Sequence, residues 1–267
     1  MDFLFLLANT VILRPYVFVF LAVSLYIARQ LLGWKRTSRL FGITWAIAFI
    51  AEFSSTRIGI PFGDYFYTGS TVGQELYISN IPFMDSLSFS FLLFASYCVA
   101  LVFVLPHAKI AEHRGWQFDP TLRTSWPAVG LTVVFFTFSD VIIDPVALQG
   151  ERWFLGKIYG YPHEAIYFGI PLANFAGWAV VGFVSLSFYR WLERGAFAED
   201  FVPREVVRRE LLLGIGLYYG VLVFNLGVTF WIGEVFMGMV GCFIFVPLTA
   251  ALIVTLWRGN AISIDHQ

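Results

Sequence analysis

Long apolar stretches separated by short polar segments constrain the fold of this chain more than any other feature of its sequence. A helix needs about 20 mostly apolar residues to cross the hydrocarbon of a bilayer. Stretches of this kind lie at about 15–33, 40–55, 81–105, 126–143, 165–191, 211–230 and 235–257. We therefore predict an all-α fold: one polytopic membrane domain over residues 1–267, with about seven transmembrane helices.

Composition supports a lipid-embedded protein. The chain is 58% hydrophobic and only 13% charged, whereas soluble domains have about 25% charged residues. The formal net charge of −1 and the lack of a Lys/Arg-rich arm argue against nucleic acid as a partner. Residues 3–13 lack the basic flank of a signal peptide, so we interpret them as an interfacial segment that ends at Arg14-Pro15 and is not cleaved.

Basic residues are distributed unevenly between the two sets of loops. Of the 17 Lys and Arg residues, all but four fall on one set of helix flanks. The exceptions are Arg14, Arg57, Arg152 and Lys157. Because basic residues accumulate in cytoplasmic loops, we predict an outside N-terminus and a cytoplasmic C-terminus. We expect the protein in the cytoplasmic (inner) membrane of a bacterium or archaeon.

A weak internal repeat relates two predicted hairpins. Residues 80–85 and 169–174 both place Ile-Pro at a helix start, after a loop rich in Gly and Tyr. Each loop follows a helix that ends in acidic residues, and Pro suits the first turn of a helix. Helices two and three therefore resemble helices four and five as copies of one hairpin. The alternative is a coincidence of Ile-Pro at two helix starts.

Acidic side chains gather at the outer ends of the predicted spans. They are Glu52, Asp85, Asp140, Asp144 and Glu234. An ionisable group within a span is energetically unfavourable, so it usually faces a polar cavity and serves a function. Asp140 and Asp144 are four residues apart and share a helix face. The alternative interpretation, a helix cap or a headgroup contact, applies best to Glu234, Asp144 and Asp85. It applies least to Glu52 and Asp140, which lie deeper, where the helix dipole disfavours an anion.

Such a cluster can divide acid and base roles between its members. One buried carboxyl can stay protonated and donate a proton, while another stays charged and accepts one. We expect Arg57 to lie beside the charged carboxylate, either within the binding site or as a structural counter-ion of Glu52. Addition of water to a double bond requires this division of roles.

Further polar and aromatic residues are candidates for substrate binding. Asn174 and Asn225 are amides within spans, and either orient a water or bond between helices. Trp178 follows Asn174 by four residues and shares its helix face. Several tyrosines stand in the outer loops, where most belong to an interfacial aromatic belt and a minority line a cavity and stabilise a carbocation. They are Tyr65, Tyr67, Tyr77, Tyr159, Tyr161 and Tyr167, of which Tyr65 and Tyr67 are the binding candidates.

No cofactor is expected. The sequence has no Gly-rich phosphate loop, nucleophile elbow or dinucleotide fingerprint. His107, Glu112 and His113 do not follow a standard ligand spacing and lie in a loop remote from the acids, so we predict no metal site.

Three ordered motifs resemble a known family. Residues 52–68 read EFSSTRIGIPFGDYFYT, residues 140–147 read DVIIDPVA, and residues 167–178 read YFGIPLANFAGW. Together they resemble the signatures of the carotenoid biosynthesis membrane family, which includes carotenoid 1,2-hydratases of the bisanhydrobacterioruberin hydratase type. The segment 83–88 departs from that pattern, because Asp85 stands where the family has an apolar segment with Pro and Trp.

The resemblance implies a cofactor-independent enzyme that adds water to the terminal C1=C2 double bond of an acyclic carotenoid. We expect Asp140 or Glu52 to protonate the alkene, and Asp144, Asp85 or Asn174 to orient the water. Membrane lipid and other carotenoid pathway enzymes are the expected partners. The alternatives are a carotene cyclase that uses the same protonation, and, in another class, a transporter or a non-catalytic pigment-pathway scaffold.

Overall fold

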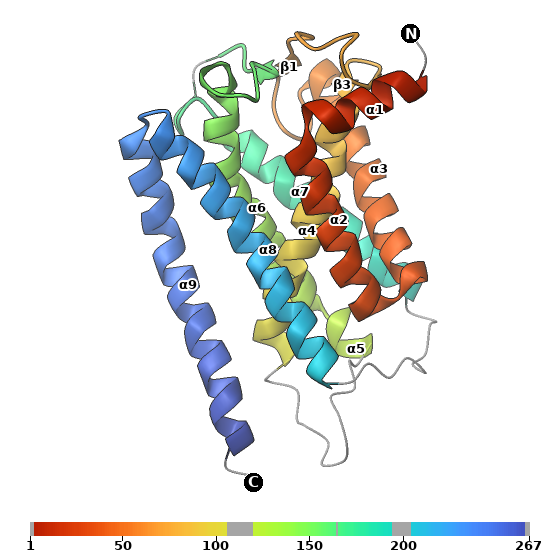
Figure 1. Ribbon diagram of the computed structural model, residues 1–267, viewed down its shortest axis with the longest axis vertical. Helices are drawn as coiled ribbons and strands as arrows, with labels where there is room; N and C mark the ends of the chain where they lie inside the picture. The colour runs from red at the N-terminus through yellow and green to blue at the C-terminus, as the bar shows by residue number, and fades with distance from the viewer. Residues whose placement is uncertain (1–2, 106–119, 164, 194–203, 265–267) are drawn as a thin grey trace.

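The computed structural model describes residues 3–105, 120–163, 165–193 and 204–264 (Figure 1). His107, Glu112 and His113 lie outside the described residues. The helices are α1 (Phe3–Leu13), α2 (Pro15–Leu32), α3 (Trp34–Ile58), α4 (Phe83–Val104), α5 (Pro120–Arg123), α6 (Trp126–Leu148), α7 (Leu172–Glu193), α8 (Arg204–Trp231) and α9 (Val235–Ile264), with a short 3₁₀ helix at Gly150–Arg152. The strands are β1 (Phe66–Tyr67), β2 (Tyr77–Ile78), β3 (Ile81–Pro82) and β4 (Tyr159–Gly160).

The predicted all-α membrane bundle is confirmed. In the part of the chain that the structure describes, six helices are long and apolar enough to cross a membrane, namely α2, α4, α6, α7, α8 and α9. The predicted span 40–55 falls within α3, which is long enough at 25 residues but more polar than the others. It still packs within the bundle, against α4 and α7 (Figure 1). The protein is thus a multi-pass membrane protein.

Two helix ends beside the loop between α6 and α7 differ from the ends of the predicted spans. The fourth span does not end at 143, because α6 continues through Pro145 to Leu148 and so includes Asp144. The fifth does not begin at 165, because α7 starts at Leu172. Gly169 has φ +84, which a right-handed helix cannot accommodate, and Pro171 lacks the N–H that would continue a helix through it. The predicted break at Arg14 is confirmed between α1 and α2.

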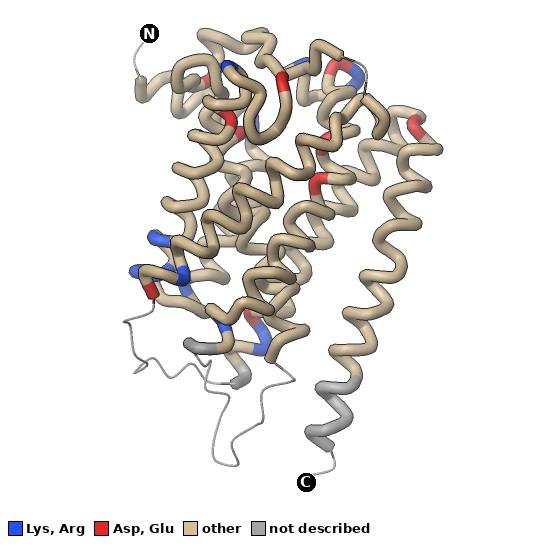
Figure 2. The backbone as a smooth tube through the Cα atoms, turned by 180° about the vertical axis from the view of Figure 1, so that it is seen from behind, with Lys and Arg blue, Asp and Glu red and all other residues tan. Residues whose placement is uncertain are grey.

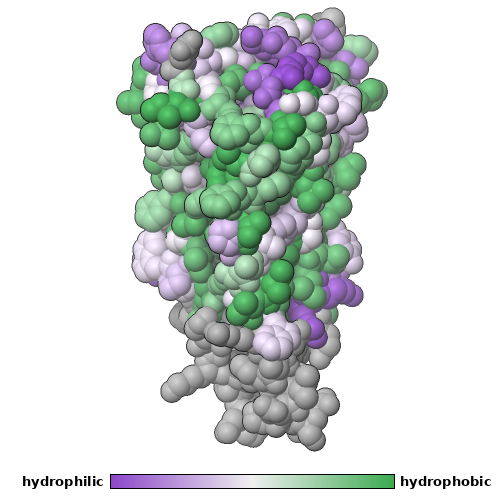
Figure 3. Space-filling model, turned by 90° about the vertical axis from the view of Figure 1, so that its left-hand side faces the viewer, coloured by the Kyte–Doolittle hydropathy of each residue, from purple (hydrophilic) through white to green (hydrophobic). Residues whose placement is uncertain are grey.

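Helix α4 forms the centre of the bundle. It packs against α2, α3, α6 and α8, and its residues from Phe89 to Val102 are buried without interruption (Figure 1). At the other extreme, α9 stands at the edge of the bundle and exposes large apolar side chains such as Phe243 and Val246. A helix that is apolar on its outer face is suited to contact with lipid tails. Figure 3 faces the side of the molecule on which α9 stands in Figure 1 and shows a mainly apolar surface there, with polar residues gathered toward its ends.

The two loops of the internal repeat meet each other. β1, in the loop between α3 and α4, pairs antiparallel with β4, in the loop between α6 and α7. Phe66 lies opposite Gly160 and Tyr67 opposite Tyr159. The loops therefore form one cover over the ends of four helices. Acidic residues gather near this end of the bundle (Figure 2); which end faces outward stays a prediction.

A buried ion pair fixes the N-terminal helices to this cover. The Arg14 guanidinium, at the junction of α1 and α2, lies 3.0 Å from the Glu75 carboxylate, and both side chains are almost fully buried. Arg14 also donates to the carbonyl of Leu155 at 2.6 Å. One guanidinium thus binds both loops, using the fixed fork of donors that only Arg provides.

This arrangement yields a stability prediction. Arg14→Met leaves Glu75 as an unpaired buried charge, so we expect a loss of about 3–5 kcal/mol, measured as a lower melting temperature of the detergent-purified protein. Lys157→Met is the control, because Lys157 and Glu151 are exposed and 3.9 Å apart; its expected change is below about 1 kcal/mol. An Arg14→Met protein that melts with the wild type would contradict the structural role of this pair.

Candidate functional site

The first half of the site joins two carboxyl groups through a phenol. Glu52 lies near the end of α3, Asp85 lies in the first turn of α4, and Tyr67 reaches them from β1. The Tyr67 hydroxyl is 3.0 Å from Glu52 Oε1 and 2.6 Å from Asp85 Oδ2. The Ser86 hydroxyl donates to the other oxygen of Glu52. Three chain segments therefore converge on one hydrogen-bonded unit.

Hydrogen counting shows that this unit holds an extra proton. A tyrosine hydroxyl has one hydrogen, and an ionised carboxylate can only accept. Tyr67 cannot donate to both Glu52 and Asp85 at once, so one carboxyl must donate to the phenol oxygen for both short contacts to be hydrogen bonds. Glu52 and Asp85 together therefore hold a proton that either can carry.

The second half joins two carboxyl groups through an amide. Asp140 and Asp144 lie one turn apart on α6, so the predicted shared face is confirmed. Asn174, in the first turn of α7, donates through Nδ2 to Asp140 at 2.7 Å and to Asp144 at 2.6 Å. Asp140 is fully buried, and within the described residues its Oδ1 has no hydrogen-bond partner.

The internal repeat relates these halves. Asp85 stands three residues after Pro82, and Asn174 stands three residues after Pro171, each in the first turn of its helix. Asn174 donates directly to the acids at the end of the preceding helix, whereas Asp85 is linked to Glu52 through the Tyr67 hydroxyl. The two hairpins thus place the same framework around different side chains, a carboxyl in one copy and an amide in the other.

A small polar cavity separates the two halves. Its volume is about 50 Å³, enough for a few water molecules. Glu52, Asp85, Asp144 and Asn174 line it, together with Tyr65, Tyr67, Tyr159 and Tyr161 from the loops. The predicted common cavity for the acids is therefore present, although Asp140 does not line it.

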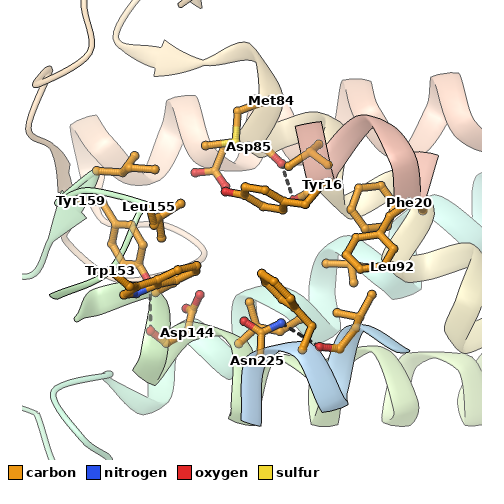
Figure 4. A pocket seen from close by; sticks show the side chains of 18 of the residues that line it. Tyr16, Phe20, Met84, Asp85, Leu92, Asp144, Trp153, Leu155, Tyr159 and Asn225 are labelled. Atoms are coloured by element: carbon orange, nitrogen blue, oxygen red, sulfur yellow. Dashed lines mark hydrogen bonds between the residues drawn. The ribbon is translucent and has the colours of Figure 1, made fainter. Parts of the chain in front are cut away.

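A larger, mainly apolar cavity lies beside the small one. Its volume is about 120 Å³, and aromatic side chains from α2, α4, α8 and the second loop surround it, among them Tyr16, Phe20, Phe91, Trp153 and Phe224. Figure 4 shows Asp85 and Tyr16 on one side of it, and Asp144 and Asn225 on the other. Four residues line both cavities, namely Asp85, Asp144, Tyr159 and Trp178.

The candidate binding residues fall mostly within these walls. Trp178 packs flat against Phe89, with ring centroids 4.3 Å apart, and so forms a rigid aromatic wall. Tyr65 and Tyr67 line the small cavity, with their hydroxyls 3.5 Å apart. Asn225 lines the larger cavity, but its Nδ2 donates to the carbonyl of Val221 on its own helix.

The structure corrects the prediction made for Arg57. The predicted pairing with Glu52 does not form, because the Arg57 side chain is exposed, lies over the ring of Phe53, and bonds to Ser79 at 3.0 Å. Glu52 and Arg57 are five residues apart on α3 and point to different sides of the helix, since five residues advance about 140° beyond a full turn. Arg57 lines neither cavity.

The loop tyrosines remain neutral donors. Burial raises the pKa of Tyr65, Tyr67 and Tyr159 well above the usual value, and the neighbouring carboxyl groups raise it further. Burial likewise raises the pKa of Tyr161. These phenols therefore keep their hydrogens throughout the physiological range. Among the described residues, no three His, Cys, Asp or Glu side chains are grouped to hold a metal ion.

Comparison with known protein families identifies the family to which this chain belongs. A family model described as "Carotenoid biosynthesis protein" matches residues 10–248. The chain belongs to the carotenoid biosynthesis protein family. The matched region contains both hairpins and all residues that line the two cavities. No curated protein matches the chain, and no solved structure does.

Some site residues of this family member were missed at the sequence level. Tyr16 and Trp153 line the larger cavity, and Ser86 binds Glu52. Tyr16 and Trp153 look like interfacial aromatics because they flank spans. The signal for Ser86 was its position next to Asp85. Tyr159, one of the loop tyrosines named from the sequence, lines both cavities.

Close packing at Gly177 yields a second prediction. A Cβ at Gly177 would overlap the ring of Phe62, which lines the small cavity and is 2% exposed. Gly177→Ala must displace this ring, so we expect a destabilisation of about 1–3 kcal/mol and a lower melting temperature. Gly220→Ala on α8 is the matched control, since no atom lies within 4 Å of its Cβ position. Equal melting temperatures for the two variants would contradict the packing described.

Proposed function

We propose that this protein adds water to the terminal C1=C2 double bond of an acyclic carotenoid. Its family indicates a role in carotenoid biosynthesis. The observation that carries the finer proposal is the contact between the cavities: a polar chamber of water size shares two carboxyl groups with an aromatic cavity. Water and a hydrocarbon end group can therefore meet at Asp85 and Asp144.

The reaction proceeds in two steps. A neutral carboxylic acid donates its proton to C2, which breaks the π bond and leaves a tertiary cation at C1. The ring faces of Trp178 and Tyr159 stabilise this cation. A water from the small cavity then forms the C1–O bond, and a carboxylate accepts the proton that this water releases. The sum is the addition of one water, without an oxidant or reductant.

The geometry favours Asp85 and Asp144 as the groups that touch substrate, because only these carboxyls line both cavities. Glu52 lines the small cavity alone, and Asp140 lines neither. Glu52 and Asp140, the donors expected from the sequence, therefore do not touch the substrate. Glu52 acts through its hydrogen bond with Tyr67, and Asp140 acts through its hydrogen bond with Asn174.

A lipid-soluble substrate fits the position of the larger cavity. Phe20 on α2 and Phe224 on α8 line it and are themselves only partly buried. The end group can occupy the cavity while the rest of the polyene extends between these helices into lipid. We expect the protein in the cytoplasmic membrane, beside other enzymes of the pathway.

A carotene cyclase is the second candidate, since it begins with the same protonation. The small polar cavity favours hydration, because water next to the cation competes with ring closure. Transport is less well supported: toward the other end of the bundle, the core beneath the cavities is filled by apolar side chains such as Leu93, Phe94 and Phe136. A pure scaffold would not require buried acids.

Expression in a lycopene-producing bacterium tests the proposal directly. We expect pigments that are heavier than lycopene by one or two molecules of water, detected by chromatography and mass spectrometry. A pigment of unchanged mass but altered retention would identify a cyclase. Lycopene recovered unchanged beside folded, membrane-inserted protein would refute both.

Neutralising the acids tests the mechanism. Asp85→Asn and Asp144→Asn should each lower the rate of hydration by at least about 100-fold, the usual contribution of a general acid or base. Glu52→Gln and Asp140→Asn should have smaller effects, because these groups act through a neighbour. Glu151→Gln, at an exposed carboxyl near the same end of the bundle, is the control. Unchanged product in all four site variants would exclude acid catalysis by this cluster.

A further inference from the structure

We propose that Tyr67 passes protons from Glu52 to Asp85, so that Asp85 is the acid that protonates the carotenoid and Asp144 is the base that deprotonates the water. The inference rests on the proposed hydration and assigns its two roles. It follows from a difference between the two halves of the site: a hydroxyl links one pair of carboxyls, and an amide links the other.

The link in the first half can transfer a proton. A phenol can accept a hydrogen from one neighbour while it donates its own to another. The Tyr67 oxygen lies within hydrogen-bond distance of both Glu52 and Asp85, at 3.0 and 2.6 Å. Ser86 holds Glu52 from the other side, which keeps Oε1 turned toward the phenol. A concerted shift of two hydrogens therefore carries a proton from Glu52 to Asp85 without forming a phenolate.

The link in the second half cannot transfer a proton. An amide NH₂ is a donor only and does not give up its hydrogens at neutral pH. Asn174 directs this group at Asp140 and Asp144, at 2.7 and 2.6 Å, so both oxygens act as acceptors. A donor aimed at a carboxyl favours its ionised form. The hydrogen bond from Asn174 therefore favours the carboxylate form of Asp144, which faces both cavities.

The small cavity closes the proton cycle. In each turnover Asp85 loses a hydrogen to C2, and Asp144 gains one from the attacking water. The next turnover requires the reverse transfer. Glu52, Asp85 and Asp144 all line the small cavity, so its water can carry the hydrogen from Asp144 to Glu52. Tyr67 then passes it to Asp85. No outside proton source or co-reactant is needed.

Tyr67 is therefore a positioning residue that returns a proton to the catalytic residue Asp85 after each turnover. This role predicts a kinetic difference between the first turnover and the later ones. In Tyr67→Phe, Asp85 is still protonated in the resting enzyme, because it can load slowly from the chamber water. We expect the first turnover to keep its rate, while later turnovers slow by about 100-fold, the lower end of the usual contribution of general acid–base catalysis. The product trace becomes a burst of one hydroxyl group per enzyme, followed by a slow phase.

The measurement is rapid quenching of purified enzyme in lipid nanodiscs with lycopene in excess. Glu52→Gln, which removes the proton source but keeps the side-chain shape, should give the same burst and guards against misfolding of one variant. Asp85→Asn should lose the burst as well as the steady state. Tyr77→Phe is the matched control, since the Tyr77 hydroxyl bonds to Thr71 in the loop between α3 and α4 and lines neither cavity.

Each outcome decides between the possibilities. A first turnover that slows as much as the later ones, in both Tyr67→Phe and Glu52→Gln, means that these residues only shape the site and overturns the relay. Steady-state rates equal to the wild type overturn it too. If the wild type hydrates lycopene in either case, the proposed function stands. A wild type that forms no hydrated product removes the proposed function and the relay together.

Discussion

Buried carboxyl groups in a bundle surrounded by hydrocarbon must find their hydrogen-bond partners within the protein, and this requirement organises the whole structure. Water cannot reach them freely and lipid offers no donors. Here the solution is to share partners: one phenol between Glu52 and Asp85, and one amide between Asp140 and Asp144. Because each set of partners comes from different segments of one hairpin, the hydrogen bonds that stabilise the acids also fix the parts of that hairpin relative to one another.

The loops gain their importance from the same requirement. Tyr67 reaches the acids only because β1 pairs with β4, which holds the first loop over the helix ends. Arg14 attaches this cover to the N-terminal helices through Glu75 and the carbonyl of Leu155. Both cavities are thus bounded by residues from loops as well as helices, and the aromatic walls of Trp178 and Phe89 complete them. The site is a joint product of the helices and their connections.

The helices could be predicted from the sequence because their signals are local. Length and apolarity identify a span, and Pro82 and Pro171 mark two helix starts. The spacing of Asp140 and Asp144 was also sufficient, since residues four apart share a face whatever the tertiary structure. The prediction for Arg57 failed because it used distance along the sequence alone. Arg57 is close to Glu52 in sequence, but the two side chains point to different sides of α3, and Arg57 bonds to Ser79 instead.

The cavities could not be predicted because they depend on how each helix is rotated within the bundle. Tyr16 and Trp153 flank spans as interfacial aromatics do, and nothing local distinguishes them from such residues. The bridge at Tyr67 depends on strand pairing between two loops about 90 residues apart, a contact that no short-range pattern encodes. Only the internal repeat hinted that these loops belong together.

The buried apolar side chains next to the cavities, Leu93, Phe94 and Phe136, have a consequence for the membrane around this protein. A chamber that exchanges protons inside a bilayer would dissipate an ion gradient across that membrane if it were open to both sides. Leu93, Phe94 and Phe136 are completely buried below the acids and provide no group along which a charge can hop. These side chains bound the chamber on the side toward the middle of the bundle and so oppose the passage of charge from it.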